Sequence, residues 1–232
     1  MSRWLIELKG DRLDVEEFPK WFPRGDIYAI EEGGNVYLVG SALDGMKEPD
    51  AVLAKVQEAL DEFSAVISLL WNGFTKPQIG QVLLEDSSGK RSAYLFMTGI
   101  AAGRSKASGV LVDAGAMAAA PKTTQAQDML AAAKESPHLY EAIKVWADPI
   151  RTWGRLYRVM EEIKKHCGQP INKVGLCTEG ELKRFTQTAN TAEAAGLDAR
   201  HASKSFDLPK DPMSLDEAES FISSLLEKAL RR

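Results

Sequence analysis

Apolar and polar residues alternate over several short stretches of the first hundred positions, and a period of two is typical of β-strands. Strands are expected at residues 4–8, 26–30, 35–40, 78–85 and 91–100. Because glycine readily takes positive φ, Gly33-Gly34 predicts a hairpin turn between the second and third stretches. Pro19 and Pro23 forbid a central strand between the first two stretches, so residues 1–48 are expected to consist of strands and turns.

A different period governs residues 50–71. Apolar side chains recur there at steps of three and four, which predicts the buried face of a long helix: Val52, Val56, Leu60, Phe63, Ile67 and Leu70. Asn72-Gly73 ends the pattern, because glycine suits the left-handed position after a helix. Residues 1–115 are therefore expected to form an α+β module, with one long helix packed on a mostly antiparallel sheet.

The pattern after residue 136 is helical throughout. Residues 116–135 are rich in alanine and are interpreted as a linker that is helical at its end. Helices are expected at residues 137–147, 150–167, 179–190 and 214–230. Their starts carry cap signals, at Ser136-Pro137, Asp148-Pro149, Thr178 with Glu181, and Ser214 with Glu217. Residues 136–232 are thus predicted to form a four-helix bundle-like domain with one long connection at 191–213.

Composition and charge narrow the function classes. The 232 residues carry a formal net charge of −4, so no overall positive field attracts nucleic acid. Residues 1–120 contain 12 basic and 17 acidic side chains, whereas residues 121–232 contain 17 and 16, so a polyanion contact belongs to the second half. No signal peptide or membrane-spanning stretch is found, which predicts a cytoplasmic protein without a membrane partner.

The chain carries few residues for metal or cofactor chemistry. Two cysteines are too few for a disulfide scaffold. His166, Cys167 and Cys177 supply fewer ligands than a structural zinc site needs, so no metal is expected. Phosphate-binding loops, dinucleotide fingerprints and nucleophile elbows are absent from the sequence, and no cofactor is expected.

A basic stripe is expected on the second helix of the predicted bundle. Its members fall on one side of the helix, opposite the apolar positions: Arg151, Arg155, Arg158 and Lys165. Two interpretations stand. The stripe is a solvated face partly neutralised by Glu162, or its three arginines are binding residues for phosphate or for a partner.

Polar residues also gather, without helical or strand periodicity, after Asn190. Histidine moves protons near neutral pH and arginine neutralises phosphate, so His201 with Arg200 suggests RNA cleavage without metal. Arg184 on the preceding helix adds a second positive charge, and Asn190 and Asp198 are further binding candidates. In the alternative interpretation, Asp198 and Arg200 fix the connection to the bundle and His201 caps backbone groups.

The order of these features resembles a known family. A helix ending at Asn190, then Arg200-His201, then Pro-Met-Ser-Leu-x-Glu-Ala opening the last helix, is similar to the C-terminal regions of prokaryotic HEPN and abortive-infection-type proteins. The resemblance covers residues 137–230 and implies four or five helices. Active members of that family are metal-independent ribonucleases, commonly dimeric, in phage-defence and toxin systems. The family motif separates its arginine from its histidine by several residues, whereas here the two are adjacent. His201 is the implied counterpart of the histidine, and the arginine role falls to Arg200 and Arg184 or is absent.

Two function hypotheses follow from these patterns. In the first, the chain is a HEPN-like protein that cleaves or binds RNA in anti-phage defence or a toxin system. In the second, it is a non-enzymatic protein-interaction or ligand-sensing module that dimerises through its helical domain. The candidate partners are therefore RNA, another protein, or a second copy of the chain.

Overall fold

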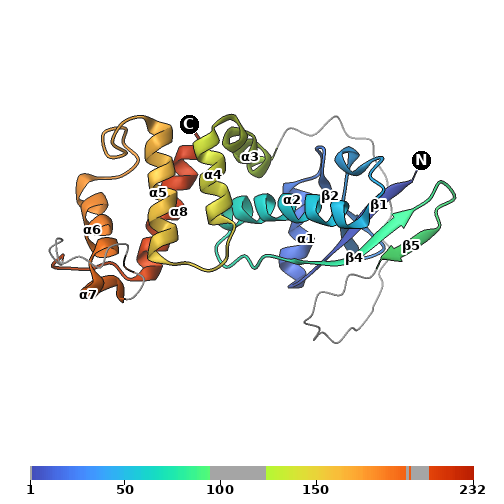
Figure 1. The fold of residues 1–232 in the computed structure, drawn as a ribbon, viewed down its shortest axis with the longest axis horizontal. Coiled ribbons are helices and arrows are strands. Elements are labelled where there is room, and N and C mark those ends of the chain that lie inside the picture. The colour runs from blue at the N-terminus through green and yellow to red at the C-terminus, as the bar shows by residue number, and fades with distance from the viewer. Residues whose placement is uncertain (1, 95–123, 197–198, 200–208) are drawn as a thin grey trace. The chain divides into compact units, whose positions relative to one another are not determined.

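A computed structural model describes residues 2–94, 124–196, 199 and 209–232 (Figure 1). The elements, in chain order, are β1 (Arg3–Lys9), α1 (Arg12–Trp21), β2 (Tyr28–Glu32), β3 (Asn35–Val39), η1 (Ser41–Leu43), α2 (Pro49–Leu70), β4 (Gln78–Glu85), β5 (Arg91–Tyr94), α3 (Gln125–Glu135), α4 (Pro137–Trp146), α5 (Trp153–Cys167), α6 (Glu179–Asn190), α7 (Ala192–Ala195) and α8 (Leu215–Leu230). A five-stranded antiparallel sheet and a set of helices make up the described residues, which confirms the α+β class.

The chain divides into two compact units. The sheet unit comprises residues 1–60 and 73–127, and the helical unit comprises residues 61–72 and 128–232. The long helix α2 was expected to belong wholly to the sheet module, but its last turns fall in the helical unit. The predicted linker at residues 116–135 lies partly outside the described residues, and its second half is α3.

The strands of the sheet unit follow the order β2-β3-β1-β4-β5, and each neighbouring pair is antiparallel. Gly33 and Gly34 join β2 to β3 with φ of 62° and 77°, which confirms the predicted hairpin. One face of the sheet is the main core of the unit and carries the buried side chains Trp4, Ile6, Leu8, Val36, Leu38 and Val82. Side chains alternate along strands, so the opposite face carries a second cluster. That cluster consists of Leu5, Tyr37, Val39 and Leu83, with Tyr28 and Ile30 packed against it.

A helix that the sequence pattern did not predict, α1, lies between β1 and β2. The carboxylate of Asp11 accepts a hydrogen bond from the amide of Leu13 at 2.9 Å and caps its start. Pro19 lies two residues before the end of the helix at Trp21, so the one backbone hydrogen bond that it cannot donate is lost in the last turn. The expectation of strands and turns over residues 1–48 was therefore wrong here.

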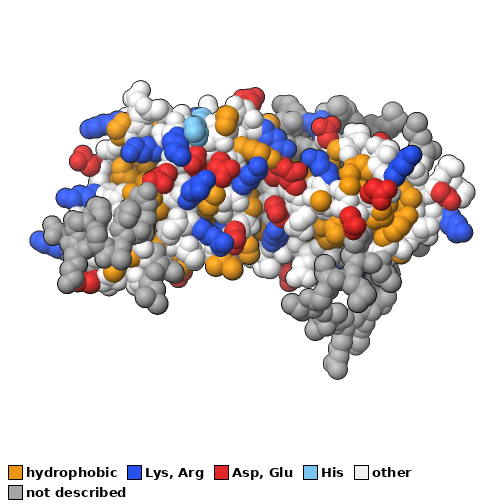
Figure 2. All heavy atoms as spheres, viewed as in Figure 1, with side chains coloured by type: hydrophobic (Ala, Val, Ile, Leu, Met, Phe, Trp, Pro, Cys, Tyr) orange, Lys and Arg blue, Asp and Glu red, His pale blue; other side chains and the backbone are white. Residues whose placement is uncertain are grey.

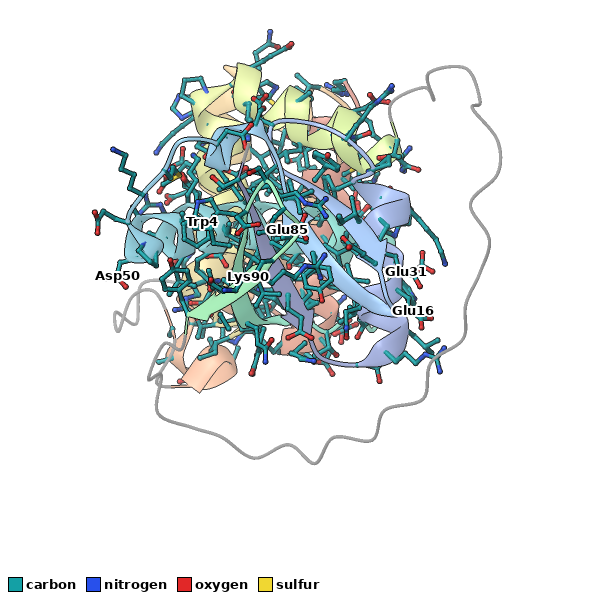
Figure 3. The ribbon with its side chains drawn as sticks, turned by 90° about the vertical axis from the view of Figure 1, so that its right-hand side faces the viewer. Trp4, Glu16, Glu31, Asp50, Glu85 and Lys90 are labelled. Carbon is teal, nitrogen blue, oxygen red and sulfur yellow. The ribbon has the colours of Figure 1, made fainter. Side chains whose placement is uncertain are left out.

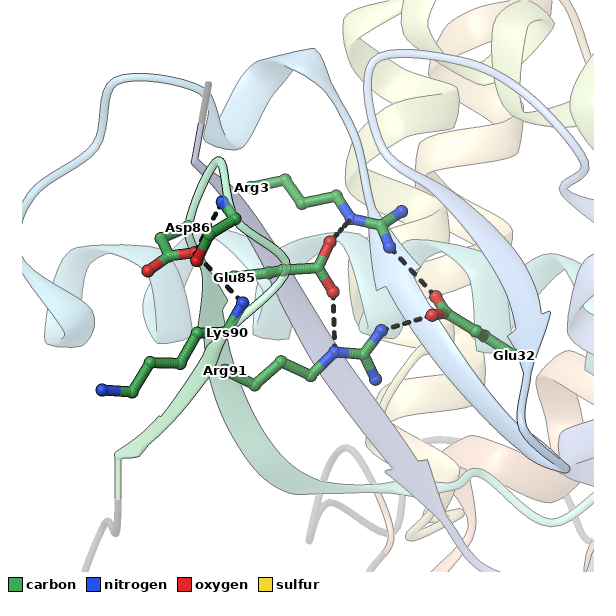
Figure 4. A network of polar contacts seen from close by, with 7 residues as sticks. Arg3, Glu32, Glu85, Asp86, Lys90 and Arg91 are labelled. Atoms are coloured by element: carbon green, nitrogen blue, oxygen red, sulfur yellow. Dashed lines mark hydrogen bonds and ion pairs between the residues drawn. The ribbon is translucent and has the colours of Figure 1, made fainter.

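A ring of four charged side chains crosses the second face of the sheet (Figure 4). Arg3 donates to Glu85 at 2.8 Å and to Glu32 at 3.1 Å. Arg91 donates to the other oxygen of Glu85 at 2.7 Å and to the other oxygen of Glu32. Both oxygens of each carboxylate are thereby used, and the hydrogen bond from Arg3 is the main cause that holds the pKa of Glu85 below its usual range.

In the helical unit, α5 packs against α4, α6 and α8. Phe185 of α6 is fully buried, and its ring lies 5.6 Å from Phe221, 6.0 Å from Tyr157 and 6.2 Å from Trp153. These aromatic contacts join α6 to both α5 and α8, so α6 and α8 meet at Phe185 and Phe221.

The starts of these helices follow the sequence signals in three of four cases. Ser136 caps α4, and both predicted capping boxes are present, at the starts of α6 and α8. The fourth signal was misinterpreted, because α5 begins at Trp153 with Thr152 as its cap. Asp148 instead closes a local turn by accepting a hydrogen bond from the amide of Ile150 at 2.8 Å.

Candidate functional site

Arg184, the predicted second phosphate ligand, lies on α6 and is already bound within the chain. Its guanidinium donates to the carbonyl of Asp211 at 2.7 Å and lies 3.0 Å from the carboxylate of the same residue. It also donates to both carboxylate oxygens of Glu217, at 3.2 and 3.3 Å. Two carboxylates therefore compensate one guanidinium, and Arg184 holds the start of α8 and the segment before it.

A groove of about 540 Å³ runs between α6 and α8 and contains Arg184 in its wall. Its volume falls in the range of small-ligand sites. Apolar and polar side chains share its surface: Leu176, Cys177, Glu181, Arg184, Met213, Asp216, Glu217, Ser220, Phe221, Ser224, Leu225 and Lys228. This groove therefore contains one predicted site residue, Arg184.

Asn190, predicted to bind a ligand, is 3% exposed at the end of α6. Its Nδ2 donates to the carbonyl of Thr186 at 2.7 Å. Its Oδ1 is buried and has no hydrogen-bond donor among the described residues. The amide nitrogen therefore has a structural role in α6.

The remaining members of the predicted catalytic cluster, Asp198, Arg200 and His201, lie outside the described residues. Their roles as acid/base, phosphate ligand and binding residue stay predictions. The structure thus locates Arg184 and Asn190 of that cluster and leaves the predicted convergence untested.

The basic stripe differs from its expected geometry. Arg151 precedes α5, and its side chain is only 15% exposed. Its guanidinium lies 4.1 Å from the ring centroid of Trp146 and donates to Glu219 at 2.8 Å and to the carbonyls of Trp146 and Asp148. Arg151 therefore connects the α4–α5 turn to α8, and it was wrongly placed on the exposed side of a helix.

The other two arginines of the stripe are also paired. Arg155 lies 2.6 Å from the carboxylate of Asp148, and Arg158 donates to Glu141 at 3.1 Å. Figure 2 shows Lys and Arg side chains interspersed with Asp and Glu side chains on the visible face. This pattern agrees with the interpretation of the stripe as a neutralised face.

Sequence reasoning missed a histidine–carboxylate pair between α4 and α5. Nδ1 of His138 lies 2.9 Å from Glu162, whose side chain is only 5% exposed. Lys165 donates to the other oxygen of Glu162 at 2.7 Å. This hydrogen bond, more than that of His138, lowers the pKa of Glu162 against the opposing effect of burial. An ionised carboxylate only accepts hydrogen bonds, so Nδ1 of His138 carries the proton.

A second unpredicted contact joins the same two helices. Oγ of Ser136 lies 2.9 Å from Nδ1 of His166 and also accepts the amide proton of Leu139, as the cap of α4. His138 lies near the start of α4, and His166 lies near the end of α5. Their partners lie 24 and 30 residues away in sequence, so no local pattern reveals these contacts.

Neither cysteine is bridged or arranged for metal. Cys167 and Cys177 are free and partly buried, and burial is the main cause that raises the pKa of both thiols. Across the residues that the structure describes, no group of three or more His, Cys, Asp or Glu side chains is arranged to hold a metal ion. In the same residues, no helix combines the length and the apolar character needed to cross a bilayer.

Comparisons of the chain with family models, with curated proteins and with solved structures found no match. The interpretation of the site therefore rests on its geometry.

Proposed function

We propose that this chain is a non-enzymatic protein-interaction module. The observation that carries the proposal is the pairing of its predicted phosphate ligands: each described one makes an ion pair with a carboxylate of the same chain. A polyanion would have to displace these carboxylates. A guanidinium that is already paired with a carboxylate has little net charge, so it attracts a nearby phosphate only weakly.

The sheet unit supports the same conclusion. Arg3 and Arg91 are closed into the ring with Glu32 and Glu85. Figure 3 shows Glu16 and Glu31 on one side of this unit, and both carboxylates attract Arg12. Arg3, Arg12 and Arg91 of the sheet unit thus face carboxylates, as the predicted phosphate ligands of the helical unit do.

The groove between α6 and α8 gives the proposal a positive basis. It combines an apolar floor with hydroxyl, carboxylate and ammonium groups at its rim. Such a mixture of an apolar centre and a polar rim is typical of surfaces that bind other proteins.

The test measures RNA binding and cleavage by the full chain. A fluorescein-labelled single-stranded RNA is titrated at low and high KCl, and total RNA is incubated with wild type and His201→Ala. We expect weak binding without a steep salt dependence, intact RNA in both reactions, and no difference between the two proteins. Binding that falls by about tenfold or more as salt rises, as several phosphate contacts require, would overturn the proposal.

A matched pair of variants distinguishes a specific role of Arg184 in RNA binding from the loss of one positive charge. Lys183→Gln removes the same charge from an adjacent exposed position of α6 that makes no ion pair with another described residue. Arg184→Gln is expected to change RNA binding no more than Lys183→Gln does. RNA cleavage lost in His201→Ala and reduced in Arg184→Gln would instead establish the RNA-directed function.

A further inference from the structure

One face of α8 presents a regular polar row to the groove. Asp216, Ser220, Ser224 and Lys228 all line it, and they are spaced by four residues. Residues four apart lie above one another on a helix, so the row runs along the groove from a carboxylate, through two hydroxyls, to an ammonium.

An apolar row lies beside this polar row. Phe221 and Leu225 follow Ser220 and Ser224 by one position each and line the same groove. The ring of Phe221 is in contact with buried Phe185 of α6, which fixes the floor. The groove therefore offers an apolar track next to a polar one.

The polar row is available to a partner, in contrast to Arg184 of α6 and Glu217 of α8, which pair with each other. The hydroxyls of Ser220 and Ser224 take part in no hydrogen bond with the residues that the structure describes. Asp216 makes no ion pair with any other described side chain. Lys228 donates to the carbonyl of Leu176 at 3.1 Å and keeps further N–H groups for a ligand.

The length of the row gives the number of residues that an extended peptide would place along it. A rise of about 1.5 Å per residue over the twelve residues from Asp216 to Lys228 gives roughly 18 Å. An extended peptide advances about 3.3 Å per residue, so the same length corresponds to about five or six residues.

We propose that this groove binds an extended peptide segment of a partner protein, with a basic residue at Asp216, an acidic residue at Lys228 about five residues away, and an apolar side chain over Phe221. The hydroxyls of Ser220 and Ser224 bind its backbone or polar side chains between the two charges. The inference rests on the proposed interaction function and names the chemistry of the partner.

The test is a selection followed by a charge swap. A phage-displayed library of random dodecapeptides is panned on the full chain and counter-selected on Ser224→Trp, which fills the groove; circular dichroism checks that this variant is folded. We expect enriched peptides to pair a Lys or Arg with an Asp or Glu about five residues apart. Enrichment without this charge spacing, or equal enrichment on Ser224→Trp, would refute the inference.

Lys228→Glu supplies the second arm. The best selected peptide is expected to bind this variant about three- to fivefold more weakly, the size of one exposed charge pair. A peptide with its acidic residue changed to Lys should recover that loss on Lys228→Glu. Lys164→Glu, an exposed lysine of α5 that does not line this groove, is the control and should bind as wild type does. Unchanged binding to Lys228→Glu would contradict the proposed docking.

The outcomes distinguish the two proposals. If no charge-paired peptides are enriched and RNA is neither bound nor cleaved, the groove is not the peptide site. The proposed interaction function would then belong to another surface. Cleavage of RNA removes the interaction function itself.

Discussion

The two units organise charge around carboxylates in different environments. In the sheet unit, Glu85 accepts from Arg3 and Arg91 while its own side chain is 16% exposed. In the helical unit, Glu162 accepts from His138 and Lys165 while its own side chain is 5% exposed. Each carboxylate connects separate elements, and Glu162 is the more deeply buried of the two.

This difference predicts that substitutions at the two carboxylates change the free energy of unfolding by unequal amounts. An exposed ion pair gains little because water and salt screen it, whereas a buried polar group left without its partners bears a desolvation cost. In the sheet unit, the ion pairs therefore add little to the free energy of unfolding, which comes mainly from the burial of apolar side chains. In the helical unit, the same kind of contact adds a buried hydrogen bond between α4 and α5.

The largest effect is expected from Glu162→Gln. The amide is neutral and has one acceptor oxygen instead of two, so it cannot accept from both His138 and Lys165 as the carboxylate does. Loss of a buried hydrogen bond to a charged group costs about 1.5–3 kcal/mol in the free energy of unfolding, measured by urea denaturation. Glu85→Gln is the matched change in the sheet unit and should cost less. Equal losses would show that burial does not distinguish the two carboxylates.

An intermediate effect is expected from acid. The pKa of Glu162 is lowered by Lys165 and His138, and the pKa of Glu217 by the amide of Ser214 and by Arg184. A carboxylate whose folded pKa lies below its unfolded value of about 4.3 stabilises the fold above that pH and loses this contribution as the pH falls toward the folded value. The free energy of unfolding should therefore decrease from pH 5 downward, with a shallower slope in Glu162→Gln. A parallel slope in that variant would assign the acid sensitivity to other carboxylates.

The smallest effect is expected from Arg91→Gln, which opens the ring on the sheet. Because the ring is partly exposed, screening at about 1 M NaCl should weaken it in the wild type as well. The difference in melting temperature between wild type and Arg91→Gln is thus expected to shrink from low to high salt. A difference that does not depend on salt would indicate that Arg91 acts through its contact with Tyr37, whose ring centroid lies 5.8 Å away.

Local sequence patterns predicted the turns and helix starts of this fold, because interactions between neighbouring residues determine those features. The Gly33-Gly34 hairpin and the capping boxes at Thr178 and Ser214 depend on residues within a few positions of one another. Helix α1 was missed because Pro19 and Pro23 were interpreted only as evidence against a central strand. Pro19 lies inside the helix, where proline removes one backbone hydrogen bond without preventing the helix.

The site was less predictable, because its contacts join distant residues. Arg184 meets Asp211 27 positions later, and no spacing rule relates them. The row on α8 differs, since the interval of four between Asp216 and Ser220, continued to Lys228, is visible in the sequence. What the sequence does not show is that α6 leaves this row uncovered.

Glu217 has a further consequence for how the helical unit assembles. One of its oxygens accepts the amide of Ser214 at 2.8 Å and so sets the first turn of α8, while the same carboxylate holds Arg184 of α6. Winding of that turn and docking of its neighbour are thereby coupled. Fraying at the start of α8 should release the guanidinium, and undocking of α6 should promote fraying, so the two events are expected to occur as one cooperative opening.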